Sequence, residues 1–521
     1  MSTPVVKPDS SSPGAPAKGG MQKILDVVER VGNKVPHPAL IFLFLIVLVV
    51  ILSQILHMAG ASVTAEIINP ETHEPEATTI AARSLVTADG IRFIYTSLIP
   101  NFMSFTAVGL MIVAMVGAGV AEEAGLVKAL IRKLVMVSPR WAITYILVFV
   151  GILSSIAADA GYLVLVPLAG AAFLSVGRHP LAGLAAGFAA VAGAFTVNML
   201  IKPLDAVLTE FTNDAIHMVD PSTSIGLTAN LWFSVASVIL LTFVVTLITE
   251  RVIEPRLGTY SGEKPEDAEN TVSPEEARGL RFALVGLLGV IGFFGVLCVP
   301  SWGPLRDPST GAVIGDSPFM NGLIAVIMVL FLVTGAAFGF GSRKFTNVTD
   351  VVKAMEKAIS GLGGLIFLLL IISQFIAYFN YSNLGTLMAL SMADMLKSAN
   401  IGPLWLLLGF IVVVAIIDLL ITGAIAKWAI FAPIFVPLLV RLGVDPEAVL
   451  AAYRIADSPM NAITPLNAYF VLAVTIAQKY NKEAGVGTVV ALMLPYVGLM
   501  FLAWTVLFVA WFVLGLPWGL N

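Results

Sequence analysis

The sequence predicts an all-α polytopic membrane protein with nine transmembrane helices and two re-entrant helical hairpins arranged as an inverted repeat. Three observations predict this fold class. Of the 521 residues, 58% are apolar and only 12% are charged, and a globule of this size cannot hide so much apolar surface in one core. Apolar runs long enough to cross a bilayer recur along the chain. Polar breaks interrupt these runs at two similar places.

Composition excludes several other classes of protein. The formal charge of −4 comes from 29 basic and 33 acidic residues and gives no basis for a nucleic-acid partner. The single cysteine, Cys298, excludes an internal disulfide and a cysteine metal cluster. The five histidines show no paired-ligand spacing, and no GxxxxGKS or GxxxxGKT phosphate loop occurs. We therefore expect no cofactor, apart from a candidate sodium ion considered below.

The chain divides into four segments. Residues 1–37 are polar, lack the early apolar stretch of a signal peptide, and are predicted to form a cytoplasmic N-terminal segment. The first membrane half covers 38–250, a charged cytoplasmic loop covers 251–280, and the second half covers 281–515.

Nine full crossings are predicted from apolar runs of about 20 residues, the length that spans a bilayer core as a helix. One of them follows a helix-start signature in which Ser273 is the N-cap and Glu276 is the third helical residue. The crossings lie near 38–58, 93–118, 182–218, 230–250, 281–300, 319–340, 358–380, 447–480 and 487–515.

Two further apolar segments are too long for one crossing and too short for two. Segment 141–177 is interrupted at 154–161, and segment 403–440 is interrupted from residue 418 to residue 428. Arms of roughly 12–16 residues reach only about 18–24 Å as helix. Each segment is therefore predicted to be a re-entrant hairpin that enters and leaves on the same side of the membrane.

The distribution of basic residues predicts the orientation. With the N-terminus inside, cytoplasmic segments hold 21 Lys and Arg residues and outer segments hold 5, which satisfies the positive-inside rule. The remaining three, Lys202, Lys427 and Arg454, fall within the membrane. The C-terminus is then outside, and the two hairpins enter from opposite sides.

Each hairpin is followed by an interrupted span, and the two interruptions resemble each other. The first contains NMLIKPLDA, starting at Asn198, and the second contains NAITPLNA, starting at Asn461. Pro203 and Pro465 are separated by 262 residues, as are Asp205 and Asn467. This offset indicates duplication, and the opposite hairpin orientations make the repeat inverted. Such repeats are typical of secondary transporters, whose site lies at mid-membrane between the repeats.

Polar groups at these breaks are the first site candidates. Pro203 and Pro465 should each unwind a helical turn, because proline removes a backbone donor. Unwound carbonyls can hold a cation. Asn198, Asn461 and Asn467 are expected to hydrogen-bond a substrate there.

Charged residues within the spans are costly and usually functional. Arg454 and Asp457 are spaced i,i+3 and could pair on one helix face, either as a structural pair or as a coupling site. Asp205 is a candidate coupling or cation site, with partnership to Lys202 as the structural alternative. A sodium ion could accordingly bind at Asp205 and Asp457.

The hairpin tips provide further candidates. Asp159 and Lys427 occupy equivalent tips and could pair, and Asp159 is expected near the substrate path. Asp418 is interpreted as structural. Trp428 follows the second tip, where its ring could stack on a flat substrate or belong to the interfacial aromatic belt.

Four strings carry a family resemblance: GYLVLVPLAG at 161–170, GRHPLAGLAAGFA at 177–189, AKWAIFAPIFVPLL at 426–439 and YRIADSPMNAITPLNAYF at 453–470. They resemble the AbgT family of bacterial inner-membrane transporters of p-aminobenzoyl-glutamate and related compounds. The resemblance implies a homodimer, nine spans with two hairpins, and import of p-aminobenzoyl-glutamate or proton-driven export of sulfonamide antimetabolites. It also implies sodium binding in some members.

The resemblance adds residue roles. Trp428, Arg454, Asp457 and Pro465 match the family pattern, and Asp205 matches its acidic residue after the first break. Pro446 matches the proline that begins the second broken span. Three features depart from the pattern: the tip before Trp428 lacks both of the usual serines, Lys202 precedes Pro203, and Met460 stands where a threonine is common.

These observations together predict a secondary active transporter that works by alternating access on small aromatic anions such as p-aminobenzoyl-glutamate or p-aminobenzoate, or on sulfonamides. Protons or sodium ions would drive it. A sodium-coupled dicarboxylate carrier of similar hairpin architecture is the main alternative. An intramembrane enzyme using Asp159 and Asp457 as an acid pair, and a passive channel, are weaker alternatives.

Overall fold

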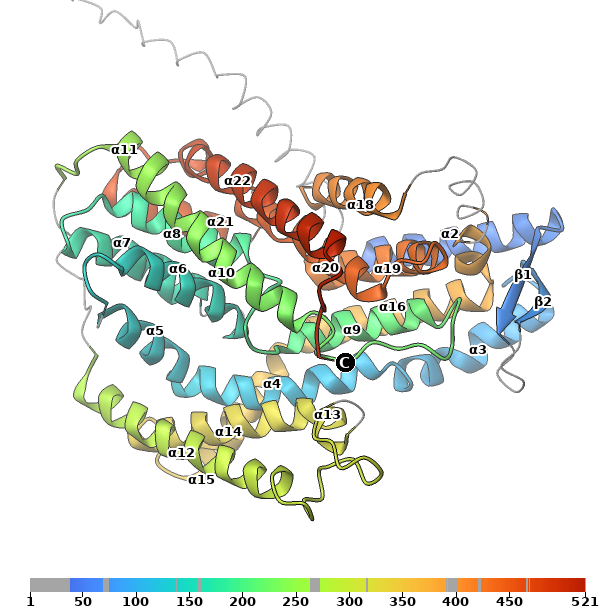
Figure 1. Cartoon of the computed structure of the whole chain (residues 1–521), viewed down its shortest axis with the longest axis horizontal. Helices are drawn as coiled ribbons and strands as arrows, with labels where there is room; N and C mark the ends of the chain where they lie inside the picture. The colour runs from blue at the N-terminus through green and yellow to red at the C-terminus, as the bar shows by residue number, and fades with distance from the viewer. Residues whose placement is uncertain are drawn as a thin grey trace, which may run out of the picture.

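The computed structural model describes residues 38–68, 75–136, 138–157, 161–262, 272–314, 317–389, 391, 402–419, 423–464, 467 and 469–520. Helices dominate these residues (Figure 1), so the predicted all-α membrane fold is confirmed. The predicted cytoplasmic segment 1–37 lies outside the described residues, as do Asp159 and Pro465.

The first part of the chain contains ten described α-helices and three short turns of other helical type. The short turns are a 3₁₀ turn, Ser154–Ala157, and two π-helical turns, Gly161–Leu165 and Thr249–Ile253. The α-helices are α2 (Pro38–Met58), α3 (Ala88–Met103), α4 (Thr106–Ala124), α5 (Leu126–Met136), α6 (Ile143–Leu153), α7 (Val166–Ser175), α8 (Pro180–Gly193), α9 (Pro203–Ile216), α10 (Leu231–Ile248) and α11 (Glu254–Leu257).

The second part begins at the predicted capping signature, which is confirmed: Ser273 Oγ accepts from the Glu276 N–H at 3.1 Å, and the Glu276 carboxylate accepts from the Ser273 N–H. Its described helices are α12 (Pro274–Cys298), α13 (Pro318–Asn321), α14 (Leu323–Gly341), α15 (Val348–Gly361), α16 (Gly363–Tyr381), α18 (Pro403–Asp418), α19 (Ala424–Arg441), α20 (Pro446–Asp457), α21 (Phe470–Tyr480) and α22 (Val486–Val513).

Eight helices or continuous helix pairs in the described residues are long and apolar enough to cross a membrane. This criterion of helix length and apolarity does not confirm the predicted number of nine crossings. One of the eight is α19, which the sequence assigned to a hairpin arm, whereas α8, α20 and their continuations are individually short. Nine crossings therefore stay a prediction.

Residues 59–92, between the first two predicted crossings, contain regular structure that was not predicted from the sequence. β1 (Ser62–Ile68) pairs with β2 (Pro75–Ala81) in an antiparallel ladder from Ser62 opposite Ala81 to Ile68 opposite Pro75. Both strands are rich in Thr, Val and Ile, which favour extended backbone. The polar composition of the whole segment obscured this short strand signal.

Two groups of helices pack differently. α4, α5, α12, α14 and α15 share one small apolar cluster and lie together along the lower left of Figure 1. Glycines bring their backbones close: a Cβ at Gly335 of α14 would lie 2.6 Å from the Ala121 Cα of α4. Close approach at small residues is the usual packing of membrane helices. The other described helices surround the large core that contains α8 and α20.

The two predicted hairpin segments and the two broken spans are all interrupted in the structure. α6 and α7 are separated by the short turns at 154–165, and α18 is separated from α19 at 419–423. The first broken span is α8 and α9 with a break at 194–202, and the second is α20 and α21 with a break after Asp457. We refer to 143–175 and 403–441 as the first and second hairpin segments.

Candidate functional site

The first break lies directly against the end of α20. The Thr196 N–H donates to Ser458 Oγ at 3.1 Å, and Thr196 Oγ1 donates to the Arg454 carbonyl oxygen at 3.0 Å. Both hydroxyls also contact each other, and both residues are fully buried. Segments more than 250 residues apart therefore meet in the middle of the large core, as the predicted repeat requires of its site.

Arg454 and Asp205 form a buried ion pair across this junction. Arg454 Nη1 lies 2.7 Å from Asp205 Oδ1, and Arg454 Nε donates to Asn230 Oδ1 at 3.1 Å. The expected pair of Arg454 with Asp457 is therefore wrong. The two residues share α20, but Arg454 reaches toward α9 and α10 whereas Asp457 reaches toward α19.

Lys202 makes no ion pair with Asp205 through its side chain. The Lys202 backbone N–H donates to Asp205 Oδ2 at 2.9 Å, which caps the start of α9. Its ammonium contacts the Phe195 carbonyl oxygen and lies 3.3 Å from Ser155 Oγ. Among the described residues, Lys202 is thus a buried cation held by neutral oxygens.

A second buried charge cluster lies at the tip of the second hairpin segment. Lys427 Nζ lies 2.7 Å from Asp457 Oδ1 and contacts Asp418 Oδ1. The Tyr453 hydroxyl lies 3.1 Å from Asp457 Oδ1. Lys427, Asp418 and Asp457 are each completely buried. The expected contact of Lys427 with Asp159 involves a residue outside the described part of the chain.

The side chains of the three asparagines donate hydrogen bonds to backbone carbonyl oxygens at or beside the breaks. Asn198 Nδ2 donates to the Leu153 carbonyl oxygen at 3.0 Å and to Ser155 Oγ at 3.1 Å, which ties the first break to the end of α6. Asn461 Nδ2 donates to the Asp457 carbonyl oxygen at 3.1 Å, and Asn467 Nδ2 donates to the Asn461 carbonyl oxygen at 2.9 Å. These amides satisfy backbone groups that the breaks leave open.

Trp428 is completely buried rather than interfacial. Its indole N–H is 3.1 Å from the Leu208 carbonyl oxygen and 3.0 Å from Thr212 Oγ1, both on α9. One ring face stacks on Tyr453 at a centroid distance of 4.4 Å. The interfacial-belt alternative is therefore excluded, and Trp428 links the second hairpin segment to α9.

Two of the three prolines predicted to interrupt the spans, Pro203 and Pro446, lie at the starts of helices. Pro203 is the first residue of α9 and Pro446 is the first residue of α20. Proline fits this position because the first helical N–H needs no partner within the helix. The interruption predicted at Pro203 lies directly before it, at 194–202, and Pro465 lies outside the described residues.

The charges at this site balance. In the described residues the buried cations are Lys202, Lys427 and Arg454, and the buried carboxylates are Asp205, Asp418 and Asp457. No group of three or more His, Cys, Asp or Glu residues that could hold a metal occurs in the described part of the chain. Asp418, interpreted from the sequence as structural, contacts Lys427 at this site, and Tyr453 was not among the sequence candidates. A carboxylate at the end of an apolar run was the signal for Asp418.

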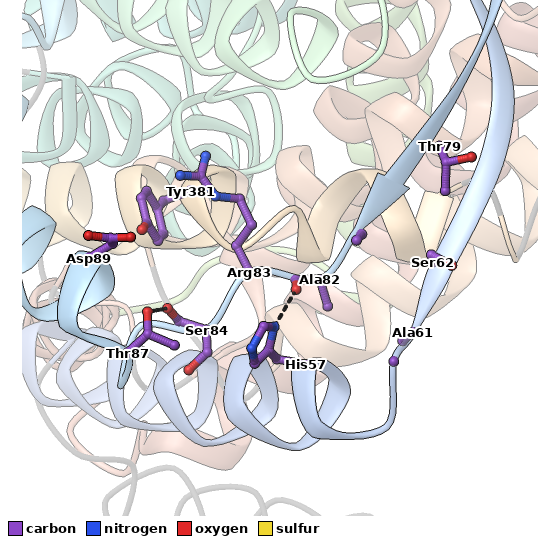
Figure 2. Close-up of a pocket in the computed structure, with 12 residues that line it drawn as sticks. His57, Ala61, Ser62, Thr79, Ala82, Arg83, Ser84, Thr87, Asp89 and Tyr381 are labelled. Atoms are coloured by element: carbon purple, nitrogen blue, oxygen red, sulfur yellow. Dashed lines mark hydrogen bonds between the residues drawn. The ribbon is translucent and has the colours of Figure 1, made fainter.

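A separate cavity of about 580 Å³ lies between the end of α2, the β1–β2 strands and the start of α3 (Figure 2). The Arg83 guanidinium sits 4.3 Å from the centroid of the Tyr381 ring, and a His57 ring nitrogen is 3.0 Å from the Ala82 carbonyl oxygen. None of the candidate residues at the breaks lines this cavity. It is therefore distinct from the junction of the two breaks.

Comparison with known proteins agrees with this architecture. The p-aminobenzoyl-glutamate transport protein of Escherichia coli K12 is 34% identical over 496 residues, which cover 95% of each chain. The solved structure of the Alcanivorax borkumensis YdaH transporter is 41% identical with a TM-score of 0.86, over 93% of this chain and 100% of that one.

A second solved structure, Neisseria gonorrhoeae MtrF, is described as illuminating a class of antimetabolite efflux pumps. It is 39% identical with a TM-score of 0.89, over 95% of this chain and 99% of that one. These relatives are transporters or efflux pumps, which confirms the prediction of a transporter rather than an enzyme. The model of the "AbgT putative transporter family" matches residues 23–521. This chain, with its helix breaks meeting at a buried, charge-balanced junction, belongs to the AbgT family of transporters.

Proposed function

We propose that this protein is a secondary active transporter that moves small aromatic anions of the p-aminobenzoyl-glutamate or p-aminobenzoate type, or sulfonamide antimetabolites, by alternating access. The observation that carries the proposal is the junction at which the first break meets α20. Three buried cations and three buried carboxylates lie there in a core of apolar helices. Charges buried at membrane depth are expensive and mark substrate or ion pathways.

We assign ion coupling to Asp205, Arg454 and Asp457, with a proton or a sodium ion as the coupling ion. Asp205 and Asp457 belong to different broken spans, and each contacts a cation from another helix. Loading or unloading an ion at either carboxylate would therefore change a contact between helices. Such a change is what couples an ion to a conformational step.

We assign substrate contacts to Trp428, Asn198, Asn461 and Asn467, with Asp159 near the path. The substrate ring would stack on Trp428 in a conformation in which Tyr453 has moved away from the indole face that it now covers. The amides at the breaks would bind the polar groups of the substrate. Pro203, Pro446 and Pro465 would position the half-helices around it.

The proposed setting is the bacterial inner membrane, with the N-terminus in the cytoplasm, the C-terminus in the periplasm and the chain assembled as a homodimer. This orientation is supported by the excess of basic residues in the predicted cytoplasmic segments. Transport could run as import or as antiporter-type export, because the gradients decide the direction of an alternating-access carrier.

The experiment is flux in proteoliposomes loaded with radiolabelled p-aminobenzoyl-glutamate or p-aminobenzoate, under a pH gradient or a sodium gradient imposed separately. We expect saturable, gradient-driven flux that Asp457→Asn abolishes. The control is Asp89→Asn, which alters an exposed ion pair with Arg92 and should leave flux unchanged. Unchanged flux in Asp457→Asn, in protein that elutes as a folded species, would contradict the proposal. Preferential flux of succinate or citrate would instead identify a dicarboxylate carrier.

A further inference from the structure

Two helices end in carboxylates at the same buried point. Asp418 is the last residue of α18, and Asp457 is the last residue of α20. The C-terminal end of a helix carries a partial negative charge, which makes a carboxylate unfavourable there and a cation favourable. Both side chains are fully buried. This point in the core is therefore strongly electronegative and requires a cation.

The cation in this structure is a side chain of the protein. Lys427 lies in the first turn of α19, where the positive end of the helix disfavours a cation. Its ammonium nevertheless lies 2.7 Å from Asp457 Oδ1 and in contact with Asp418 Oδ1. The charge of each of the three residues is thus unfavourable at its own helix end. Each charge is stabilised by the opposite charge beside it. Such a local conflict is expected at a functional position.

We propose that Lys427 is a tethered cation that fills the cation site formed by Asp418, Asp457 and the ends of α18 and α20, so that no sodium ion binds there. The ammonium is a compact point charge, as an alkali cation is. A second cation beside it would meet direct like-charge repulsion in a buried environment. The occupation of this site by Lys427 does not depend on the proposed function. Its consequence does rest on the proposed function: coupling through Asp457 does not use sodium.

The surroundings of Lys427 are consistent with this role. α18 contributes Asp418, and α20 contributes Asp457 and the Tyr453 hydroxyl. The Asn461 amide lies 3.4 Å from Asp457 Oδ2. Arg454, the other cation of α20, is directed to Asp205. Lys427 is therefore the cation that the described residues place against these two carboxylates.

Lys202 offers a matched comparison within the same chain. It is also a buried lysine next to a break, but its ammonium contacts the Phe195 carbonyl oxygen and Ser155 Oγ. Removing it exposes no carboxylate pair among the described residues. Only the loss of Lys427 should create an empty site with two carboxylates.

The test is thermal unfolding of the purified full-length protein in detergent, in sodium, potassium or choline chloride at equal ionic strength and alkaline pH. We expect the wild-type melting temperature to be the same in all three salts. In potassium, Lys427→Asn should have a lower melting temperature than the wild type. Sodium should raise the melting temperature of this variant, saturably and specifically, by roughly 2–4 °C, because an ion that binds only the folded state stabilises it. Lys202→Asn and Lys427→Arg should show no sodium effect.

A sodium-specific rise in the wild type that disappears in Asp457→Asn would overturn the proposal, as would Lys427→Asn without any sodium effect. If Lys427→Asn does not yield folded protein, Asp418→Asn/Lys427→Asn removes one charge of each sign and should show a smaller sodium-specific rise, because Asp457 and the ends of α18 and α20 remain. These measurements need no substrate. Failure of transport with every tested anion would count against the proposed function, and the melting data would still decide the role of Lys427.

Discussion

In the residues that the structure describes, the two hairpin segments are held by charged contacts at opposite ends. The first has these contacts at its base, where Arg178, just after α7, makes a bidentate pair with Glu254 at 2.8 and 2.5 Å. The second carries them at its tip, where Lys427 meets Asp418 and Asp457 in the buried core. Neutral hydrogen bonds from Asn198 fix the described end of α6 near the first tip.

This difference separates two tasks. At the partly exposed base of the first segment, Arg178 pairs with Glu250 in the π-helical turn Thr249–Ile253 and with Glu254 in α11. At the tip of the second segment, Lys427 and Asp457 form an ion pair in the buried core. Among the described residues, the ion pair of Asp205 with Arg454 joins the first broken span to the second, beside the hydrogen bonds that Thr196 makes with Arg454 and Ser458. The predictions below test the ranking of these contacts.

The largest effect is expected at the pair that joins the two broken spans. Arg454→Gln leaves the Asp205 carboxylate buried without its cation, which should cost about 3–5 kcal/mol of folding free energy. The melting temperature of the purified protein in detergent should fall accordingly, and transport should be lost.

The double variant Asp205→Asn/Arg454→Gln is the control for this prediction. It removes both charges, so most of the stability should return while transport stays absent. The exposed ion pair of Arg92 with Asp89 is the reference for a small effect on stability. Arg92→Gln should change the folding free energy by about 0–0.5 kcal/mol. Equal losses in Arg454→Gln and Arg92→Gln would refute the ranking.

A smaller effect is expected where the second hairpin segment meets α9. Trp428→Phe keeps an aromatic ring against Tyr453 but removes the N–H that reaches Leu208 and Thr212, at a cost of about 1 kcal/mol. Trp504→Phe is the matched control, because this equally buried tryptophan donates a similar bond to Ser237 Oγ at 2.8 Å. The melting temperature should fall by a similar amount in both variants. Only Trp428→Phe should change the KM for transport of an aromatic anion. Unchanged KM would remove Trp428 from the substrate path.

The smallest effect is expected at the base of the first hairpin segment and depends on pH. His179 caps α8 by accepting from the Leu181 N–H at 3.2 Å, which only the neutral ring can do. Burial lowers the pKa of His179 below its ordinary value of 6.5, although nearby Glu254 opposes the shift. The capping contribution is therefore fully present above about pH 6.5 and is lost as the pH falls through the lowered pKa.

His179→Asn tests this dependence, because asparagine retains a capping oxygen and does not titrate. The variant and the wild type should melt alike near pH 7.5. Near pH 5.5 the variant should be the more stable by about 0.5–1 kcal/mol, the usual value of an N-cap. Parallel melting curves across this range would show that the cap does not depend on the protonation of His179.

Much of the fold could be read from local sequence. The apolar runs became helices, the interruptions at 154–161 and after Asp418 became gaps between helices, and the Ser273 signature became a capping box. The strands at 62–81 were missed because their short Thr and Val pattern lies within a polar loop. The break at Pro203 could be predicted because proline ends a helix before it and also fits the first position of the next one.

The helical segments, most of their interruptions and the charged residues of the apolar core follow from local sequence. These properties depend on composition and spacing over a few residues. The ion-pair partners follow from how the helices pack: Arg454 pairs with Asp205 and not with Asp457, and Lys427 lies between Asp418 and Asp457. An i,i+3 spacing permits a pair, but in a buried core each charge pairs with whichever opposite charge the packing brings within contact, however distant in sequence.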